Sequence, residues 1–245
     1  MKAIILAAGY ATRLYPLTKD FPKALLSVGG QPLLDHILNQ LNKIPEIDQI
    51  HVVSNARFYP VFFQWAQAKQ DPRLHVHNDG TQDDATRLGA IGDIDYVLKA
   101  AELNDDCLIV AGDNLLMIDY AEFFKSYRKN GSLSTLLVQK MQDTATLQRF
   151  AVAVLDEQNH VTHLVEKPKN PPSEYGVFAL YLYPASVMRM ISRYLAEGNS
   201  PDAPGNFPVW LVQHKVPVCA YITDAPCYDI GTHESLRFVR TLYGE

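Results

Sequence analysis

The sequence predicts an α/β fold of the Rossmann-like, doubly wound type: a mixed, mainly parallel sheet with a small antiparallel β cover. Over about the first 140 residues, short apolar runs alternate with segments of helical spacing, which is the pattern of βαβ units. The run CLIVA at 107–111 is continuously apolar, as expected of a central parallel strand that is buried on both faces. Farther along, short strands separated by turn residues favour antiparallel pairing.

The first half predicts strands and helices in alternation. In residues 31–41, Leu34, Ile37, Leu38 and Leu41 recur at helical spacing and form one apolar face. The predicted strands are residues 2–6, 50–53, 74–77, 107–111 and 133–138. The predicted helices are residues 31–41, 58–68, 91–101 and 120–127.

The second half predicts a hairpin and a helical cover. Residues 150–155 and 161–166 flank the turn sequence Asp-Glu-Gln-Asn, which predicts two antiparallel strands. Further strands are predicted at 177–183 and 218–222, and helices at 185–196, at 207–214 and from 233 onward. The stretch NSPDAPGN at 199–206 is rich in Pro and Gly and predicts a loop.

Composition and charge exclude several classes of partner. The chain carries 22 Lys and Arg against 27 Asp and Glu, a net charge of −5, with no basic stripe, so neither nucleic acid nor a membrane surface is an expected partner. No apolar stretch approaches membrane-spanning length, and the first apolar run is too short for a signal peptide. We therefore expect a cytoplasmic protein.

The cysteines and histidines give no metal-site pattern. The three cysteines lack metal-ligand spacing, and their odd number fits a reducing compartment. His75 and His77 alternate along a predicted strand and point the same way, but no third ligand lies nearby in the sequence. We expect both histidines to be structural or exposed.

The stretch LAAGYATRLYPLT at 6–18 follows the first strand and suggests a phosphate-binding turn. Gly9 lets backbone N–H groups approach a phosphate closely, and Arg13 and Lys23 can neutralise its charge. The stretch is not the dinucleotide-binding GxGxxG, because the third Gly is absent, and it lacks the Gly-Lys-Ser/Thr of a P-loop. Taken alone, a tight turn into a helix explains it equally well.

The longer stretch LAAGYATRLYPLT…FPKALLSVGGQPLL resembles the signature of the sugar-1-phosphate nucleotidylyltransferases, in the style of short bacterial glucose-1-phosphate thymidylyltransferase-like proteins. The family pattern is LAAGxGTRLxPLT, about four residues, then PKxLL and a PL-containing helix. Four more motifs follow in family order: Leu88 to Gly92, Gly112-Asp113-Asn114, Glu166-Lys167-Pro168 and Tyr228 to Thr232. The resemblance implies the nucleotide-diphospho-sugar transferase fold. It also implies one domain over 1–245, with a nucleotide-binding half at about 1–140 and an acceptor-binding, covering half at about 141–245.

Two aspartates are the candidate metal ligands. Asp113 follows the apolar strand 107–111, and Asp229 precedes a Gly-Thr turn in the other half of the chain. Two carboxylates suit Mg²⁺, which takes few protein ligands and keeps waters and phosphate oxygens. The resemblance assigns the matching pair to Mg²⁺. Taken singly, Asp113 is equally a helix N-cap and Asp229 a turn former.

The resemblance implies nucleotidyl transfer from a nucleoside triphosphate to a sugar 1-phosphate, with release of pyrophosphate and formation of an NDP-sugar, a polysaccharide precursor. It places Arg13 and Lys23 on the triphosphate, Lys167 on the acceptor phosphate and Glu166 on acceptor hydroxyls. A surface Glu-Lys pair before a Pro turn is the ordinary alternative for the last two. The implied nucleotide-binding residues are Leu6, Ala7, Ala8, Gly9, Ala11, Thr12, Asn78 and Gly89. The implied acceptor-binding residues are Asn114, Glu166, Lys167 and Tyr181.

Three alanines stand where the family commonly has Gly: Ala11, Ala151 and Ala179. Because Ala disfavours positive φ, we expect the loop to hold Ala11 at negative φ. We expect the methyl groups of Ala151 and Ala179, with the neighbouring Phe178, to narrow or reshape the acceptor pocket. The acceptor therefore need not be glucose 1-phosphate.

Two alternatives remain open. One is the same transfer to a phosphorylated non-sugar alcohol such as phosphocholine, and the other is a catalytically silent regulatory protein that binds nucleotides or sugar phosphates. A dinucleotide-dependent dehydrogenase is disfavoured by the missing Gly. The sequence predicts neither the base nor the pathway, and it is compatible with a homo-oligomer.

Overall fold

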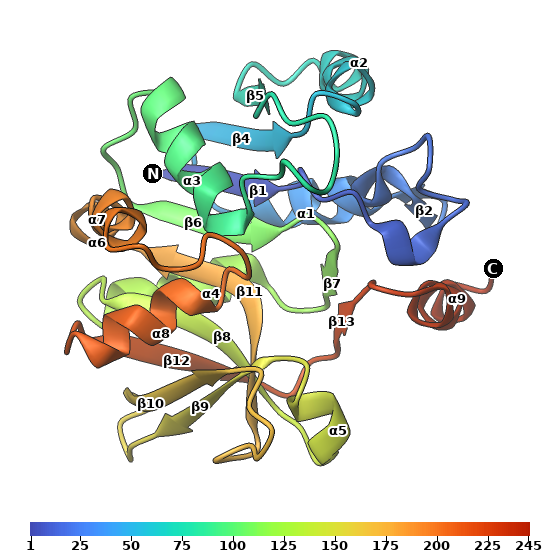
Figure 1. The fold of residues 1–245 in the computed structure, drawn as a ribbon. Coiled ribbons are helices and arrows are strands. Elements are labelled where there is room, and N and C mark those ends of the chain that lie inside the picture. Colours follow the sequence, from blue (N-terminus) through green and yellow to red (C-terminus); the bar gives the residue numbers. More distant parts are fainter.

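The computed structural model describes all residues, 1–245, and its centre is a mixed sheet with helices on both faces (Figure 1). The parallel part of the sheet consists of β1 (Lys2–Leu6), β4 (Gln49–Ser54), β5 (Leu74–Asn78) and β6 (Cys107–Ala111). Its strand order is β6-β1-β4-β5, and β1 pairs along its whole length with both β4 and β6. The predicted fold class is confirmed.

Strand β11 (Tyr175–Tyr183) joins the parallel part to the antiparallel cover. It pairs antiparallel with β6, with β8 (Ser134–Lys140) and with β9 (Ala151–Leu155). The predicted hairpin is confirmed, because β9 pairs antiparallel with β10 (Val161–Glu166). At the other side of β8, β12 (Val218–Thr223) pairs in parallel and completes the sheet.

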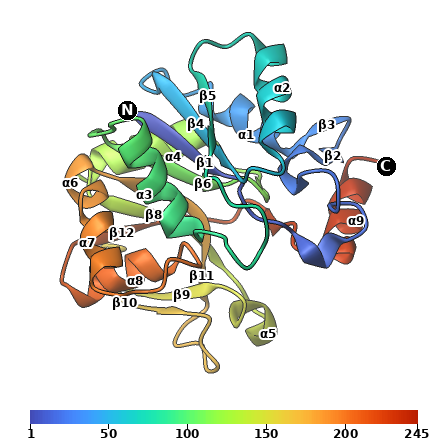
Figure 2. The same ribbon diagram turned by 45° about the horizontal axis from the view of Figure 1, so that its top comes forward.

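Each face of the sheet carries its own apolar core, and the two cores contain 27 and 26 buried residues. Figures 1 and 2 show α1, α2 and α4 on one face and α3, α6, α7 and α8 on the other. Apolar strand residues alternate between the faces: Ile5 contributes to the first core and Ile4 to the second. The helices are α1 (Leu33–Leu41), α2 (Tyr59–Lys69), α3 (Ala90–Ala100), α4 (Tyr120–Lys129), α5 (Thr144–Leu147), α6 (Ala185–Met188), α7 (Met190–Ala196), α8 (Asn206–Gln213) and α9 (His233–Leu242). None of them has both the length and the apolar content needed to cross a bilayer.

Two small sheets were not expected from the sequence. One pairs β2 (Ser27–Val28) with β3 (Gln31–Pro32), and the other pairs β7 (Asn114–Leu116) with β13 (Cys227–Asp229). The first explains why the predicted helix 31–41 starts two residues late, at Leu33: residues 31 and 32 are engaged in a ladder. Strands of two or three residues carry too few side chains for a periodic pattern.

The predicted helix 185–196 is divided in two at Arg189. This residue keeps a helical backbone, with φ −63° and ψ −19°. Only the hydrogen-bond pattern is interrupted there, and the helical backbone continues from α6 into α7. The remaining predicted helices and strands are confirmed to within about two residues at each end.

A cluster of three histidines lies on one face of β4 and β5. His51 is 2% exposed, lies in register with His75, and its Nδ1 is 2.9 Å from Nε2 of His77. Burial, followed by the charges of His77 and His75, lowers the pKa of His51 to about 3. Burial also lowers the pKa of His77. His51 and His77 are therefore neutral within the fold at physiological pH.

This cluster predicts a loss of stability in mild acid. In the unfolded chain His51 takes up a proton below pH 6.5, whereas the folded protein holds it neutral down to about pH 3, so acid favours the unfolded state. His51 should therefore cost about 2 kcal/mol of stability between pH 6.5 and pH 5. Urea unfolding at both values should show that His51→Val removes this part of the loss. His163→Val, at an exposed strand position, is the control, and equal pH dependence in all three proteins would contradict the prediction.

Candidate active site

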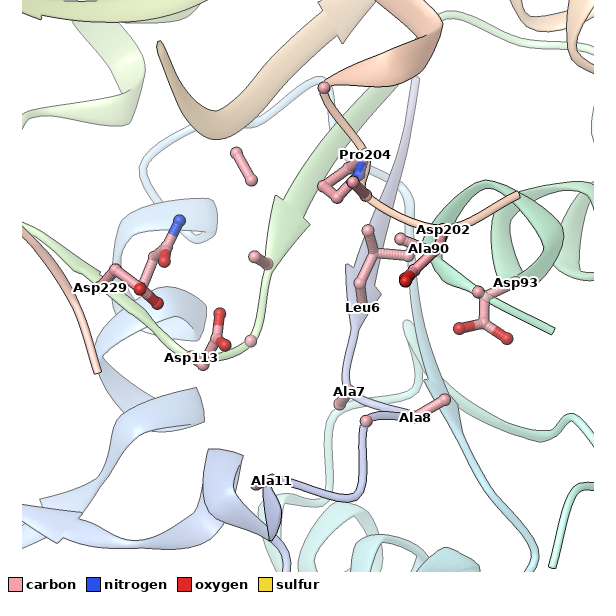
Figure 3. A pocket seen from close by; sticks show the side chains of 18 of the residues that line it. Leu6, Ala7, Ala8, Ala11, Ala90, Asp93, Asp113, Asp202, Pro204 and Asp229 are labelled. Atoms are coloured by element: carbon pink, nitrogen blue, oxygen red, sulfur yellow. The ribbon is translucent and has the colours of Figure 1, made fainter. Parts of the chain in front are cut away.

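A cavity of about 460 Å³ opens at the carboxyl ends of β1 and β6 (Figure 3). Ligands of doubly wound sheets bind at this edge. Every residue that the sequence analysis assigned to the site lines the cavity except Asn78. The residues brought together are Leu6, Ala7, Ala8, Gly9, Ala11, Thr12, Arg13, Lys23, Gly89, Asp113, Asn114, Glu166, Lys167, Tyr181 and Asp229.

Asn78 ends β5 and is the one assigned residue that does not line the cavity, so its contact with the nucleotide stays a prediction. Its side-chain oxygen accepts a hydrogen bond from the N–H of Gly80 at 2.9 Å, and its carbonyl accepts one from the Tyr96 hydroxyl at 2.6 Å. Both contacts stabilise the turn that follows the strand.

The loop after β1 is held by hydrogen bonds to its backbone carbonyls. The Asn55 side chain donates to the carbonyl of Ala8 at 2.8 Å, and the Thr18 hydroxyl donates to that of Ala11 at 2.8 Å. Ala11 lies in the left-handed region, at φ 47°, so the expectation of a negative φ is wrong. The Cβ of Ala makes this conformation cost about 1 kcal/mol more than Gly would, and the surrounding bonds hold it there. A Cβ placed on Gly9 would meet nothing within 4 Å, so the space beside its backbone is open.

The pairing of β7 with β13 brings the two candidate metal ligands together. Asp229 lies opposite Asn114 in this ladder, and the N–H of Ile230 donates to the carbonyl of Asp113 at 3.1 Å. Burial and then the charge of Asp113 raise the pKa of Asp229. Lys23 forms an ion pair with Asp113. Figure 3 shows both carboxylates on the same side of the cavity.

This pair fits a divalent cation. The charge of Asp113 disfavours ionisation of Asp229, and a cation between the two carboxylates would relieve that repulsion. No group of three or more His, Cys, Asp or Glu side chains is arranged to hold a metal. A cation that takes only two protein ligands and fills its other positions with phosphate oxygens and water suits this donor set, as Mg²⁺ does.

Two arginines flank the carboxylates. Nη2 of Arg149 is 4.0 Å from Oδ2 of Asp229. A Cβ placed on Gly231 would lie 3.2 Å from the same Oδ2 and 3.3 Å from Nη2 of Arg13. The absence of a side chain at Gly231 therefore lets Arg13 approach the acid pair.

The end of β10 places Glu166 and Lys167 in the wall of the cavity. Nζ of Lys167 is 3.5 Å from Oε1 of Glu166, and its side chain is 56% exposed. Lys167 itself has a φ of 45°, a conformation held by a hydrogen bond from its N–H to the carbonyl of Phe150 at 3.1 Å. Burial raises the pKa of Glu166, Lys167 lowers it, and Asp202 raises it further.

The three residues expected to reshape the acceptor pocket divide between two faces of the sheet. Ala151 and Ala179 line the cavity, whereas Phe178 does not. The ring of Phe178 is buried in the first core, 4.8 Å from that of Phe150 between centroids. Strand alternation explains the difference, because neighbouring residues point to opposite faces.

A group of charged residues lies around the N-terminus of α3. Nη1 of Arg87 is 2.8 Å from Asp84, and Nη2 is 2.9 Å from Asp202. Asp202 lies in the loop 199–206, which the sequence predicted as a loop without a role. The charged cavity residues that the sequence analysis did not single out are Asp93, Arg149 and Asp202.

This loop lies against the start of α3. The N–H of Ile91 donates to the carbonyl of Pro201 at 2.8 Å. Gly89 has a φ of 79°, and a Cβ there would meet the same carbonyl oxygen at 2.6 Å, so only Gly allows this contact. The glycine of the LGAIG motif is the one sequence signal that could have pointed to the loop.

Comparisons with known proteins identify the family to which this chain is similar. The family model described as "Nucleotidyl transferase" matches residues 2–244. A UTP–glucose-1-phosphate uridylyltransferase from Haloferax volcanii is 26% identical over 187 residues, which are 76% of this chain and 73% of that protein. A mannose-1-phosphate guanylyltransferase from Mycobacterium tuberculosis is 27% identical over 238 residues, 97% of this chain and 62% of that protein. The chain spans only 50% and 42% of two further archaeal relatives.

A solved structure gives the same result. The crystal structure of a "Putative Glucose-1-Phosphate Thymidylyltransferase" from Bacillus anthracis superposes with a TM-score of 0.84 at 26% identity, and the match covers 99% of this chain and 95% of that one. The family match over nearly the whole chain, the ordered motifs and the shared fold lead to one conclusion: this chain belongs to the nucleotidyl transferase family.

Proposed function

We propose that the protein is a Mg²⁺-dependent nucleotidylyltransferase that transfers a nucleoside monophosphate from a nucleoside triphosphate to a sugar 1-phosphate. The observation that carries the proposal is the arrangement of charge in one cavity. Lys23, Asp113 and Asp229 come together, and Arg13, Arg149 and Lys167 line the same cavity. A reaction between two phosphates needs positive charge on both reactants and a metal site between them.

In the proposed reaction, an oxygen of the acceptor phosphate forms a bond to the α-phosphorus of the triphosphate. The bond from that phosphorus to the pyrophosphate oxygen breaks, and pyrophosphate leaves with the electron pair. No general base is required, because the acceptor phosphate is already ionised at neutral pH. The protein contributes position and charge.

The cations of the cavity offset the repulsion between the reactants. Two like unit charges 4 Å apart repel by about 4 kcal/mol at the effective dielectric constant of a protein surface. Lys167 would hold the acceptor phosphate, and Arg13 and Lys23 the triphosphate and departing pyrophosphate. Asp113 and Asp229 would hold the Mg²⁺, which supplies neutralisation of phosphate charge when bound.

The acceptor end suits a hydroxyl-bearing group of restricted size. Glu166 offers a carboxylate to hydroxyl donors, and the methyl groups of Ala151 and Ala179 occupy space beside it. We propose that residues from about 141 onward form this acceptor-binding half and that residues up to about 140 bind the nucleotide. The Ala methyl groups also favour a second candidate acceptor, a phosphorylated non-sugar alcohol such as phosphocholine.

The first test is pyrophosphate release with Mg²⁺, crossing dTTP, UTP, CTP, GTP and ATP against glucose 1-phosphate, mannose 1-phosphate and phosphocholine. Release of pyrophosphate with a sugar 1-phosphate supports the proposal. Release only with phosphocholine would mean that the second candidate acceptor is the substrate. Triphosphate binding without release from any pair would instead indicate a regulatory protein.

Asp113→Asn should lower turnover at least about a hundredfold with the triphosphate and acceptor that react, because one metal-binding carboxylate is lost. The fold should persist, since the substitution is isosteric and the backbone contact to Ile230 remains. Pyrophosphate release and circular dichroism measure the two effects. Asp224→Asn, at an exposed position outside the cavity, is the matched control, and near-normal activity of Asp113→Asn would contradict the assigned role.

Lys167→Ala should raise KM for the acceptor about tenfold or more and leave KM for the triphosphate nearly unchanged. The reason is that the proposal places Lys167, which lies beside Glu166, on the acceptor phosphate and places Arg13 and Lys23 on the triphosphate. Steady-state kinetics with each substrate varied in turn separates the two constants. Lys169→Ala, at an exposed position outside the cavity, serves as the control, and a rise in KM for the triphosphate alone would mean that the two phosphate sites are reversed.

A further inference from the structure

The carboxylate of Glu166 lies directly against the backbone of Gly205, the residue before α8. A Cβ placed on Gly205 would overlap Oε2 of Glu166 and would lie 3.1 Å from its Cδ. It would also lie 3.3 Å from the Cβ of Ala151, which is closer than an ordinary van der Waals contact. All three residues line the cavity. The carboxylate therefore occupies the space that any side chain at position 205 would need.

Backbone conformation does not explain a glycine at this position. Gly205 has φ −67° and ψ −17°, which are helical values that every L residue adopts readily. Ala favours such a backbone over Gly, because Gly loses more conformational freedom on folding. Gly89 differs, since its φ of 79° favours glycine. At position 205 the contact with Glu166 is the observation that accounts for the missing side chain.

Two separate elements meet at this carboxylate. Glu166 is the last residue of β10 and pairs with Ala151 of β9 in the antiparallel ladder, so the two side chains are neighbours on one face of the sheet. Helix α8 packs on β10 (Figure 2) and brings the Cα of Gly205 beside the carboxylate. The room available to Glu166 is therefore set by small residues of β9 and of the start of α8.

The chain offers Glu166 little else that would fix its carboxylate. Its side chain is 17% exposed, and its ion-pair partner is Lys167, whose Nζ is 3.5 Å from Oε1. The Lys167 side chain is exposed, and an ion pair with a long, exposed side chain contributes little. Burial raises the pKa of Glu166. The packing against Gly205 is thus the contact that determines where its oxygens lie in the cavity.

We propose that Gly205 is a positioning residue for the acceptor: because it has no side chain, the Glu166 carboxylate can take the position from which it accepts hydrogen bonds from acceptor hydroxyls. This inference rests on the proposed function, which assigns Glu166 to the acceptor. Gly205 acts through Glu166. The carboxylate is the mobile end of a long side chain, so a methyl group at position 205 would displace it while the backbone stays in place.

The experiment is a double-mutant cycle of Gly205→Ala and Glu166→Ala in the full chain, with the triphosphate and acceptor that react. With Glu166 present, Gly205→Ala should raise KM for the acceptor about tenfold, because the displaced carboxylate loses its hydroxyl partner. KM for the triphosphate should change less than about twofold, since Glu166 does not contact that substrate in the proposed function. In the Glu166→Ala chain, Gly205→Ala should change KM for the acceptor less than about twofold, since no carboxylate is left to displace.

Gly176→Ala is the matched control. A Cβ there would meet Sδ of Met141 at 2.6 Å, again near the end of a flexible side chain, but Gly176 is buried in β11 and does not line the cavity. It should leave both KM values nearly unchanged. An equal rise in KM for the acceptor with and without Glu166 would overturn the inference, because the methyl group would then act on the acceptor directly. Unchanged kinetics of Gly205→Ala would overturn it as well.

Thermal unfolding of the same proteins tests the contact independently of activity. Replacing Gly by Ala in a helical backbone favours the folded state, and with Glu166 present the displaced carboxylate offsets this gain. The change in Tm caused by Gly205→Ala should therefore be about 2 °C more favourable in the Glu166→Ala chain. Equal changes in Tm in both backgrounds would overturn the inference even in an active transferase. Coupled changes in Tm in a protein that releases no pyrophosphate would support the positioning of Glu166 and overturn the proposed function.

Discussion

The three-residue pairing between β7 and β13 is the contact on which the candidate site depends. It joins residues 114–116 to residues 227–229 across more than a hundred positions of the chain and sets Asp229 opposite Asn114. Asp113 and Asp229 are half-buried acids that lie far apart in the sequence. Held together, they repel each other, and burial and then the charge of Asp113 raise the pKa of Asp229. In the proposed function, a divalent cation bound between the two carboxylates would relieve this repulsion.

The charged side chains of the cavity form ion pairs, and bound substrates would change these pairs. Lys23 contacts Asp113, Arg149 lies near Asp229 and Lys167 near Glu166. Each of these cations would have to divide its interaction between its carboxylate and an incoming phosphate. A metal between Asp113 and Asp229 would reduce the hold of those acids on Lys23 and Arg149, so metal and triphosphate binding should favour each other. Arg13 is the cavity cation that forms no ion pair within the chain. Because no carboxylate holds its guanidinium, Arg13 is suited to make the first contact with an incoming phosphate.

Backbone strain is present at three positions in the wall of this cavity. Ala11, Lys167 and Ala203 are three of the eight non-glycine residues with a positive φ, and all three line the cavity. Such conformations persist only where surrounding contacts enforce them, and they are common at functional sites. For Lys167 the left-handed backbone ends β10 and turns the side chain toward Glu166. Ala11 keeps the conformation that a glycine would adopt freely, so the loop after β1 retains its shape at a modest cost in stability.

By itself, the sequence determined the architecture and most of the candidate site. The alternation of apolar runs and helical spacing is a local signal that the folded chain retains. The motifs of the family resemblance named fifteen residues that line the cavity. Tertiary structure alone decided the rest. Asn78 lies outside the cavity and Phe178 faces the opposite core, because which face a strand residue takes depends on the register of its neighbours. Arg87, Asp93 and Asp202 meet only because the loop 199–206 lies against the start of α3. No local pattern encodes that contact, since it joins segments more than a hundred residues apart through one backbone hydrogen bond and one ion pair.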